Sequence, residues 1–284
     1  MNCIVCAGST HVGRQPWHRY CPSCRYESAD LAPLINEAYA HSQVNESERE
    51  TALKSVRTEN FKIIVERLAR IAPPTAKRLL DVGSAHGWFL DEAAKRFSVV
   101  GVEPDVVVAQ GALARGLPVR VGYFPHVLED GECFDVIVFN DVIEHIPDIH
   151  SALEACRAHL DADGLLVLNV PRSTGFFYRL SKLLARLKWR GPFDRMWQKG
   201  LPSPHVHYFN ERNLDRLVAR HGLRPVQAFH LRALSADGLL ERIRFAGQLH
   251  PVALYAQYAF LLCALPLVRL LPSDIIVCIY SKNG

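Results

Sequence analysis

A carboxylate next to a glycine turn is the first feature of the sequence that indicates ligand chemistry. The apolar run at residues 79–82 is typical of a buried parallel strand, contains Asp81, and is followed by a turn between Gly83 and Gly87. Apolar periodicity then predicts a helix over residues 88–96. A strand, a glycine-rich turn and a helix let the backbone approach a ligand closely. A phosphate-binding loop presents bare amides or a lysine, so the acid favours a cationic or hydroxyl-rich ligand.

Later strands also end in polar residues. We expect strands over residues 98–103, 134–141, 164–171, 223–229 and 274–280, with a short strand before Gly122. Glu103 follows the glycine turn by about 20 residues, the spacing at which dinucleotide-binding folds hold a ribose diol. Asn140 and Asp141 end the fourth strand. In open α/β sheets, such strand ends line the ligand site.

This ordered set resembles the class I S-adenosylmethionine-dependent methyltransferases, and within them the small-molecule group that includes the ubiquinone-pathway O-methyltransferases. The resemblance covers about residues 55–231 and the final strand. It implies a Rossmann-like α/β fold with a seven-stranded, mostly parallel sheet, and S-adenosylmethionine as cofactor. The cofactor contacts that it implies are Asp81, Gly83, Ser84, Gly87, Glu103, Pro104, Tyr123, Phe124, Asn140 and Asp141.

The resemblance also gives these residues separate roles. Asp81 would compensate the amino group of the methionine part, with Asn140 beside it, and Glu103 would accept hydrogen bonds from the ribose hydroxyls. Pro104 would lie under the adenine, and an aromatic ring from residues 122–124 would cover its other face.

The candidate for proton transfer is His145, just past the fourth strand. Methyl transfer from a sulfonium is an in-line substitution, so the protein mainly holds donor and acceptor close together. An oxygen acceptor must also lose a proton, and a histidine that titrates near neutrality can take it. The alternative is that His145 orients its loop. His205 and His207 are second catalytic candidates, and their alternative is a cap before a helix expected over residues 211–221.

Two cysteine pairs near the start of the chain predict a metal site. Cys3 and Cys6 form one C-x-x-C pair, Cys21 and Cys24 form another, and 14 residues separate the pairs. Each pair places two thiolates on one turn, and two turns complete a tetrahedral structural zinc site. The alternative is four free cysteines. Whether this knuckle docks on the catalytic domain, a partner or RNA is open at this stage.

The 284-residue chain has ordinary globular composition, with 49% apolar and 22% charged residues. Its net charge of +4 is too small to argue for nucleic acid. No cationic stretch followed by an apolar one opens the chain, so we expect no signal peptide. Eight cysteines, half of them in the paired motif, fit a reducing cytosol. We therefore expect a cytoplasmic protein, with peripheral contact at the inner membrane face as a further expectation.

The chain divides into three expected parts: a zinc knuckle at residues 1–28, a helical linker or cap at 29–74, and a methyltransferase domain at 75–284 with insertions at about 172–204 and 232–273. Within the linker, apolar spacing predicts an amphipathic helix over 47–70 that closes over the cofactor site. Tyr39 either packs or reaches the ligand.

The two insertions follow the fifth and sixth strands. Residues 176–199 combine an apolar helical face with many Lys and Arg, which is typical of a helix on an anionic membrane or of one packed on the domain with a solvated basic side. Residues 251–268 are nearly free of charge; a lone membrane-spanning helix is disfavoured, and a buried hairpin or a membrane-resting segment is expected. Both leave the sheet at its active-site edge, so 176–199 and 251–272 indicate membrane contact and a lipophilic acceptor.

We therefore expect O-methylation of a small, lipophilic or lipid-linked acceptor. One alternative is an RNA methyltransferase that docks through the knuckle. Base N-methylation commonly uses a polar-Pro-Pro-aromatic turn, which residues 140–143 lack, and the basic residues lack a clear stacking platform, so nucleic acid is not expected. The other alternative is a non-catalytic cofactor-binding scaffold, against which the intact acid and glycine positions argue.

Overall fold

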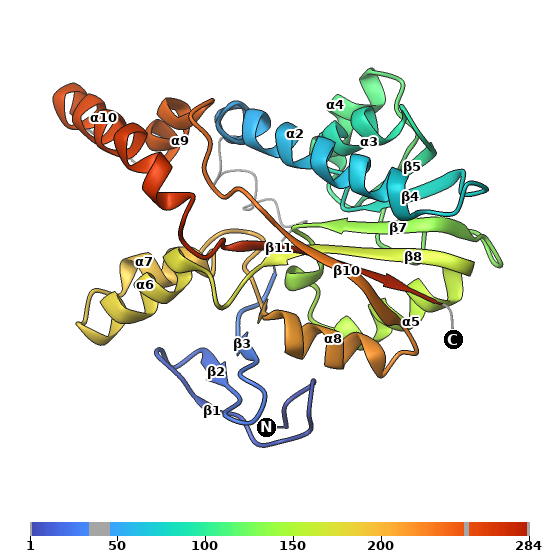
Figure 1. Cartoon of the computed structure of the whole chain (residues 1–284), viewed down its shortest axis with the longest axis horizontal. Helices are drawn as coiled ribbons and strands as arrows, with labels where there is room; N and C mark the ends of the chain where they lie inside the picture. Colours follow the sequence, from blue (N-terminus) through green and yellow to red (C-terminus); the bar gives the residue numbers. More distant parts are fainter. Residues whose placement is uncertain (1, 34–45, 247–249, 283–284) are drawn as a thin grey trace.

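The computed structural model describes residues 2–33, 46–246 and 250–282 (Figure 1). Tyr39, with its expected choice between packing and ligand contact, lies outside these residues. The predicted boundary at residue 28 falls inside a strand of the knuckle, Glu27–Ala29. The described chain contains two sheets, a large one of seven strands and a small one of four.

The large sheet has the strand order β10-β11-β8-β7-β4-β5-β6. The strands are β4 (Arg78–Val82), β5 (Ser98–Glu103), β6 (Val119–Val121), β7 (Phe134–Asn140), β8 (Leu160–Pro171), β10 (Arg224–Leu231) and β11 (Ile275–Ser281). β11 is antiparallel to both of its neighbours, and the other pairs are parallel. The predicted mostly parallel, seven-stranded sheet is therefore confirmed.

Helices cover both faces of the large sheet. One face carries Ile137 and Phe139 of β7 into a core with α5 (Ile149–His159) and α8 (Glu211–Ala219). The other face carries Val136 and Val138 into a core with α2 (Glu46–Ile71) and α3 (Trp88–Ala93). This alternation follows from the two-residue side-chain period of a strand. α4 (Val106–Ala114) follows β5, and the short 3-10 helix η1 (Ile143–His145) follows β7.

The knuckle docks on the catalytic domain. Its strands are β1 (His11–Val12), β2 (His18–Tyr20) and β3 (Glu27–Ala29), and the fourth strand of the small sheet is β9 (His207–Tyr208). β9 belongs to the methyltransferase part of the chain and pairs antiparallel with β3. The open question of where the knuckle docks is thus answered by backbone pairing within one chain.

A buried carboxylate strengthens this junction. Glu27 of β3 accepts hydrogen bonds from the Tyr178 hydroxyl at 2.8 Å and the Lys182 ammonium at 2.6 Å, and its other partner is His18 at 2.9 Å. Burial by itself would raise the pKa of Glu27, but His18 and Lys182 more than compensate and hold it below its usual value. The charge on Glu27 therefore ties the knuckle to the first insertion.

The two insertions form helical arms that project from the same side of the sheet (Figure 1). The first holds α6 (Phe176–Arg186) and α7 (Gly191–Met196), and the second holds α9 (Leu239–Ala246) and α10 (Pro251–Val268). α10 is long and apolar enough to cross a membrane by length and composition, and only 6% of it is buried. The expectation of a buried hairpin over 251–268 is therefore wrong, because most side chains of α10 are exposed, although Leu254 and Leu265 are buried against α9.

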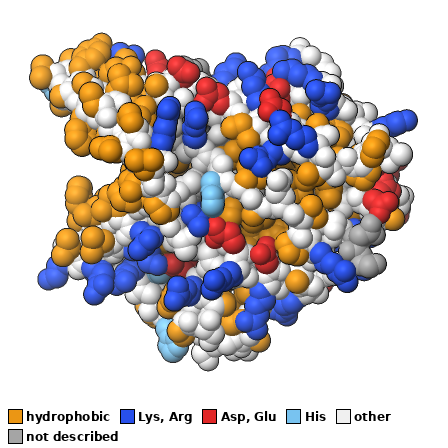
Figure 2. Space-filling view, viewed as in Figure 1, with side chains coloured by type: hydrophobic (Ala, Val, Ile, Leu, Met, Phe, Trp, Pro, Cys, Tyr) orange, Lys and Arg blue, Asp and Glu red, His pale blue; other side chains and the backbone are white. Residues whose placement is uncertain are grey.

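Apolar side chains cover both arms, with Lys and Arg beside them on the first (Figure 2). On α10, Phe260 is 70% exposed, and just past α6, Leu187 is 71% exposed. Arg179 and Arg186 are exposed on α6 as well. The first insertion therefore does not bury its whole apolar face on the domain.

Candidate active site

The turn after β4 forms a cradle at the carboxyl edge of the sheet. Gly83 and Gly87 have φ angles of 73° and 75°, in the left-handed region that favours glycine. The amides of Gly83 and Ser84 both donate to the Val102 carbonyl, at 2.7 and 3.0 Å. A Cβ on Gly83 would lie 2.5 Å from a methyl carbon of Val142, so the turn packs directly on the segment after β7. The predicted strand, turn and helix are therefore present and close to the end of β7.

Asp81 lies in this cradle and is only 1% exposed. Asn140 donates from Nδ2 to Oδ1 of Asp81 at 3.3 Å, and Asn169 donates in turn to Oδ1 of Asn140 at 3.4 Å. Burial raises the pKa of Asp81 to about 8; the Asn140 hydrogen bond opposes this shift and nearby Glu103 adds to it. A buried carboxylate with amide neighbours and a raised pKa is suited to receive a cationic ligand group.

Glu103 ends β5 on the other side of the turn. One carboxylate oxygen accepts from the Ala85 amide and the other from the Asp105 amide, each at 2.9 Å. Burial raises the pKa of Glu103 despite these hydrogen bonds. Each oxygen keeps a further lone pair, so this carboxylate can also accept hydroxyl donors of a ligand.

The three residues expected beside the adenine differ in how far they are exposed. Pro104 follows Glu103 and is half-buried. Tyr123 is 50% exposed, so its ring lies at the surface. Phe124 is partly buried and packs edge-on against Phe139, with ring centroids 5.6 Å apart. Ligand stacking by Tyr123 or Phe124 stays a prediction.

His145 lies in η1, just past β7. Its Nδ1 is 2.9 Å from the Pro204 carbonyl oxygen, and because a carbonyl only accepts, Nδ1 must carry a hydrogen. In the neutral ring, Nε2 then holds a lone pair that can accept a proton. Nε2 lies 4.0 Å from Oε1 of Glu144. This tautomer is the one that a general base needs.

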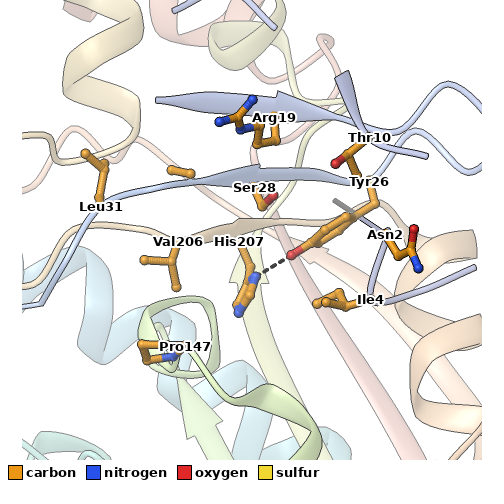
Figure 3. Close-up of a pocket in the computed structure, with 11 residues that line it drawn as sticks. Asn2, Ile4, Thr10, Arg19, Tyr26, Ser28, Leu31, Pro147, Val206 and His207 are labelled. Carbon is orange, nitrogen blue, oxygen red and sulfur yellow. Dashed lines mark hydrogen bonds between the residues drawn. The ribbon is translucent and has the colours of Figure 1, made fainter. Parts of the chain in front are cut away.

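The second catalytic candidates are placed in structural roles. His207 has the Tyr26 hydroxyl at Nδ1 and the Ile146 carbonyl at Nε2, the latter at 2.9 Å (Figure 3). Burial lowers the pKa of His207 to about 4. With both nitrogens engaged, His207 joins the knuckle to the η1 segment, and its expected catalytic role is corrected. A cavity of about 190 Å³ lies in this seam.

His205 is buried next to His145, with ring centroids 4.7 Å apart. The Gln198 amide lies 2.8 Å from Nε2 of His205, and burial lowers the pKa of His205 well below its usual range. His205 is therefore neutral and held in place, which favours a supporting role over proton transfer.

Glu144, His145 and His205 together could also hold a divalent metal. One donor atom from each of the three lies within 4.8 Å of the others. Burial, together with the nearby charge of Asp141, raises the pKa of Glu144 well above its usual value.

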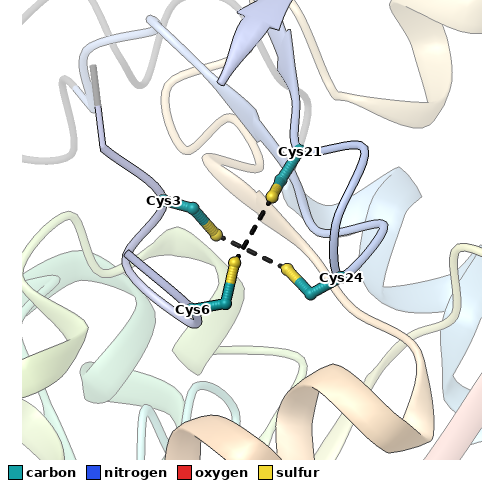
Figure 4. A group of neighbouring side chains, drawn as sticks. All are labelled: Cys3, Cys6, Cys21 and Cys24. Carbon is teal, nitrogen blue, oxygen red and sulfur yellow. Dashed lines mark hydrogen bonds between the residues drawn. The ribbon is translucent and has the colours of Figure 1, made fainter. Parts of the chain in front are cut away.

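The four knuckle cysteines converge on one point (Figure 4). Sγ of Cys3 lies 3.5 Å from Sγ of Cys24, and Sγ of Cys6 lies 3.5 Å from Sγ of Cys21. All four sulfurs lie within 4.8 Å of one another. Zinc–sulfur bonds of about 2.3 Å in a tetrahedron require sulfurs about 3.8 Å apart, so this cluster has the size of a zinc site.

An arginine-lined cavity of about 140 Å³ adjoins the cradle. Arg57 of α2 pairs with Asp141 at 3.3 Å, and Asn169 and Arg242 also line this space. No local sequence pattern points to Asn169, Arg57 or Arg242, because each enters the site through a contact distant in the chain. Asp141 has a left-handed φ of 55° and lines this cavity. Its contact with the cofactor stays a prediction.

This sheet order, with β11 as its single antiparallel strand and an acid followed by a glycine turn at the central strand, defines a class I S-adenosylmethionine-dependent methyltransferase. The family described as "Methyltransferase domain" matches residues 55–228, more than half of the chain. The chain belongs to this methyltransferase family.

Curated relatives include ubiquinone biosynthesis O-methyltransferases. The Rattus norvegicus mitochondrial protein is 27% identical over 224 residues, which are 70% of this chain and 64% of that protein. The Paramagnetospirillum magneticum protein is 36% identical over 146 residues, 48% of this chain and 58% of that protein. The chain thus spans about half to two thirds of the length of these relatives. Among solved structures, the cyclopropane synthase MmaA2 from Mycobacterium tuberculosis aligns with a TM-score of 0.60 at 16% identity, covering 89% of this chain and 100% of that one.

The raised pKa of Asp81 predicts that the ligand-free protein loses stability as the pH rises. Its pKa moves from 3.8 to about 8, so the folded protein keeps a proton that the unfolded chain has already released in this window. Asp81 alone should lower the free energy of unfolding by on the order of 1.4 kcal/mol per pH unit between about pH 4 and 8. Because the pKa values of Glu103 and Glu144 are also raised, Asp81→Asn should make this fall less steep than in the wild type rather than abolish it.

Urea unfolding at pH 4, 6 and 8 without cofactor measures this difference. Asp161→Asn, at an exposed position, is the matched control and should keep the wild-type slope. Equal slopes for wild type and Asp81→Asn would show that Asp81 is not held protonated by burial.

Proposed function

We propose that this protein transfers a methyl group from S-adenosylmethionine to an oxygen atom of a small lipophilic acceptor. The observation that carries the proposal is Asp81, buried without a cationic partner among the described residues at the edge where this fold binds ligands. Relatives named ubiquinone biosynthesis O-methyltransferase support oxygen as the acceptor atom and a quinone-type substrate class. No specific observation favours RNA, since the knuckle docks on its own chain.

The residues of the cradle fit the cofactor. Asp81 would bind its amino group, Asn140 would lie beside the methionine part, and Glu103 would accept from the ribose hydroxyls. Gly83, Ser84 and Gly87 would let the backbone close around it, with Pro104 and Tyr123 near the adenine. The Ser84 hydroxyl and Oδ1 of Asn169 are buried without hydrogen-bond partners among the described residues, so polar capacity remains at this edge. The bound cofactor supplies an electrophilic methyl group on a sulfonium.

His145 would handle the proton of the acceptor. Its Nε2 holds a lone pair because Nδ1 donates to the Pro204 carbonyl. The hydroxyl proton of the acceptor would move to Nε2 as the oxygen forms its new bond to the methyl carbon and the carbon–sulfur bond breaks. His205 beside it would hold the ring in place.

The proposed function predicts that changing Asp81 weakens cofactor binding, whereas changing His145 slows methyl transfer. S-adenosylhomocysteine should bind the wild type in a calorimeter, and Asp81→Asn should weaken that binding about tenfold or more, because a charge-assisted hydrogen bond is lost. His145→Ala should bind it normally but transfer methyl ~10²–10⁴-fold more slowly to a lipid extract with labelled donor. His126→Ala, at an exposed position, is the control. Absence of binding would refute the function, and full turnover by His145→Ala would refute the base.

We also propose that the four cysteines hold a structural zinc ion. The sulfur separations match a tetrahedral site, and the loop that carries Cys21 and Cys24 leads into β3, the strand that pairs with β9. A fully ligated zinc of this kind would stabilise the fold and take no part in the reaction.

If the four cysteines hold zinc, elemental mass spectrometry should find about one zinc ion per purified chain. Cys6→Ser should lose the metal and lower the midpoint of thermal unfolding, because the knuckle strands lose their anchor. Cys263→Ser changes an exposed cysteine on α10 and should alter neither quantity. Zinc-free wild-type protein, or zinc retained in Cys6→Ser, would contradict the proposal.

We further propose that the protein is cytoplasmic and rests on the inner membrane face through its two arms. The support is the exposed apolar surface of α10 and the mixed apolar and basic surface of α6. Apolar side chains that enter a lipid interface next to cations that meet anionic headgroups are a known mode of peripheral binding. Lys182 is not part of this surface, because it is bound to Glu27.

Membrane contact predicts flotation with vesicles that contain phosphatidylglycerol and loss of flotation with neutral vesicles or high salt. Changing Arg179, Arg186 and Lys188 to Glu should abolish it, since all three are exposed on the first arm. The matched control changes Lys62, Arg70 and Arg96, exposed cations away from the arms, and should still float. If the variant with three Glu substitutions floats as well as the wild type, the proposed membrane surface is wrong.

A further inference from the structure

The arginine-lined cavity next to the cradle holds more positive charge than the described protein neutralises. Arg57 comes from α2, while Arg232 and Arg242 come from the second insertion. Asp141, which follows β7, and Asn169, near the end of β8, also line the cavity. Its volume of about 140 Å³ exceeds what a single water needs several-fold.

Only one of these three cations has a carboxylate partner among the described residues. Arg57 pairs with Asp141 at 3.3 Å. Arg242 donates from Nη1 to the Ala233 carbonyl at 2.7 Å, a neutral acceptor. Within the described ranges, neither Arg232 nor Arg242 forms an ion pair.

Arg57 and Arg242 are partly buried, whereas Arg232 is exposed at the cavity rim. Burial lowers the pKa of the Arg242 guanidinium, and repulsion from Arg57 and from Arg195 of α7 lowers it further. Arg195 lies on the first arm and does not line the cavity, but its charge acts on Arg242. Partly buried, mutually repelling guanidinium groups are unfavourable unless an anion joins them.

We propose that this cavity binds an anionic group of the acceptor, a phosphate or a carboxylate, and so deepens the proposed methyl transfer by naming an amphiphilic substrate class. Arginine binds both groups through paired N–H donors. Asn169 links the cavity to Asp81 through Asn140, so the bound anion lies beside the cofactor cradle.

The position of the arginines assigns the anion to the acceptor. Arg232 and Arg242 belong to the insertion between β10 and β11, outside the strands and turns that form the cradle. Figure 2 shows Lys and Arg side chains at the inner end of the hollow between the two apolar arms. An acceptor with an apolar tail would extend along the arms while its charged group meets the arginines.

The test titrates inorganic pyrophosphate, inorganic phosphate and benzoate, one at a time, into protein saturated with S-adenosylhomocysteine. With the methionine carboxylate already bound, any further anion must occupy another place. We expect at least one of the three probes to bind, and Arg242→Gln and Arg232→Gln each to weaken it about tenfold or more. Arg244→Gln, an exposed change on the same α9, should leave it unaltered.

The comparison of probes distinguishes a phosphate-bearing from a carboxylate-bearing acceptor. The proposal is overturned if none of the three probes binds the saturated protein, or if probe binding is equal in wild type and both variants. It is also overturned if the variants weaken S-adenosylhomocysteine as much as the probe, because the arginines would then hold the cofactor's own carboxylate. Failure of S-adenosylhomocysteine to bind at all would instead refute the proposed function, and the probes titrated into free protein would still report on the cavity.

Discussion

The architecture of the site depends on the burial of one carboxylate, Asp81, at the end of the central strand. Its neighbours on β7 and β8 are amides, which can hydrogen-bond but bring no charge. Removing a carboxylate from water is costly, and here the protein offsets that cost by keeping a proton until a positive group arrives. The glycine turn and Glu103 lie next to this acid. The same residue that weakens the empty fold therefore prepares it for a cation.

The knuckle shapes the other wall of the site. Through β9 and the bridge from Tyr26 to His207 to the Ile146 carbonyl, it supports the backbone next to His145. The Pro204 carbonyl that sets the tautomer of His145 comes from the same segment. The small sheet is therefore a support for the reaction edge, with Glu27 fastening it to the first arm.

The sequence predicts the helices and strands whose bounds follow from the local spacing of apolar residues. The helix expected over 47–70 is found at Glu46–Ile71, and the expected strand at 98–103 has the same bounds in β5. Strand ends could be assigned to the ligand edge because parallel strands share it. Roles that depend on distant contacts could not be predicted: His207 is satisfied by Tyr26, 181 residues earlier, and Arg242 meets Arg57 only through the fold. The exposure of α10 could not be predicted either, because an apolar run has the same composition whether it is buried in a core or exposed at the surface.

The pairing of β3 with β9 has a consequence for the order in which the chain is made. Translation delivers the cysteines first and the fourth strand of their sheet about 180 residues later. A nascent knuckle can fold locally, yet its sheet edge and the face of Tyr26 stay uncovered until most of the large domain has left the ribosome. Such long-range closure is slow and leaves an open strand edge exposed. The knuckle sheet is thus completed late in synthesis, when His207 and Tyr208 become available to pair with β3.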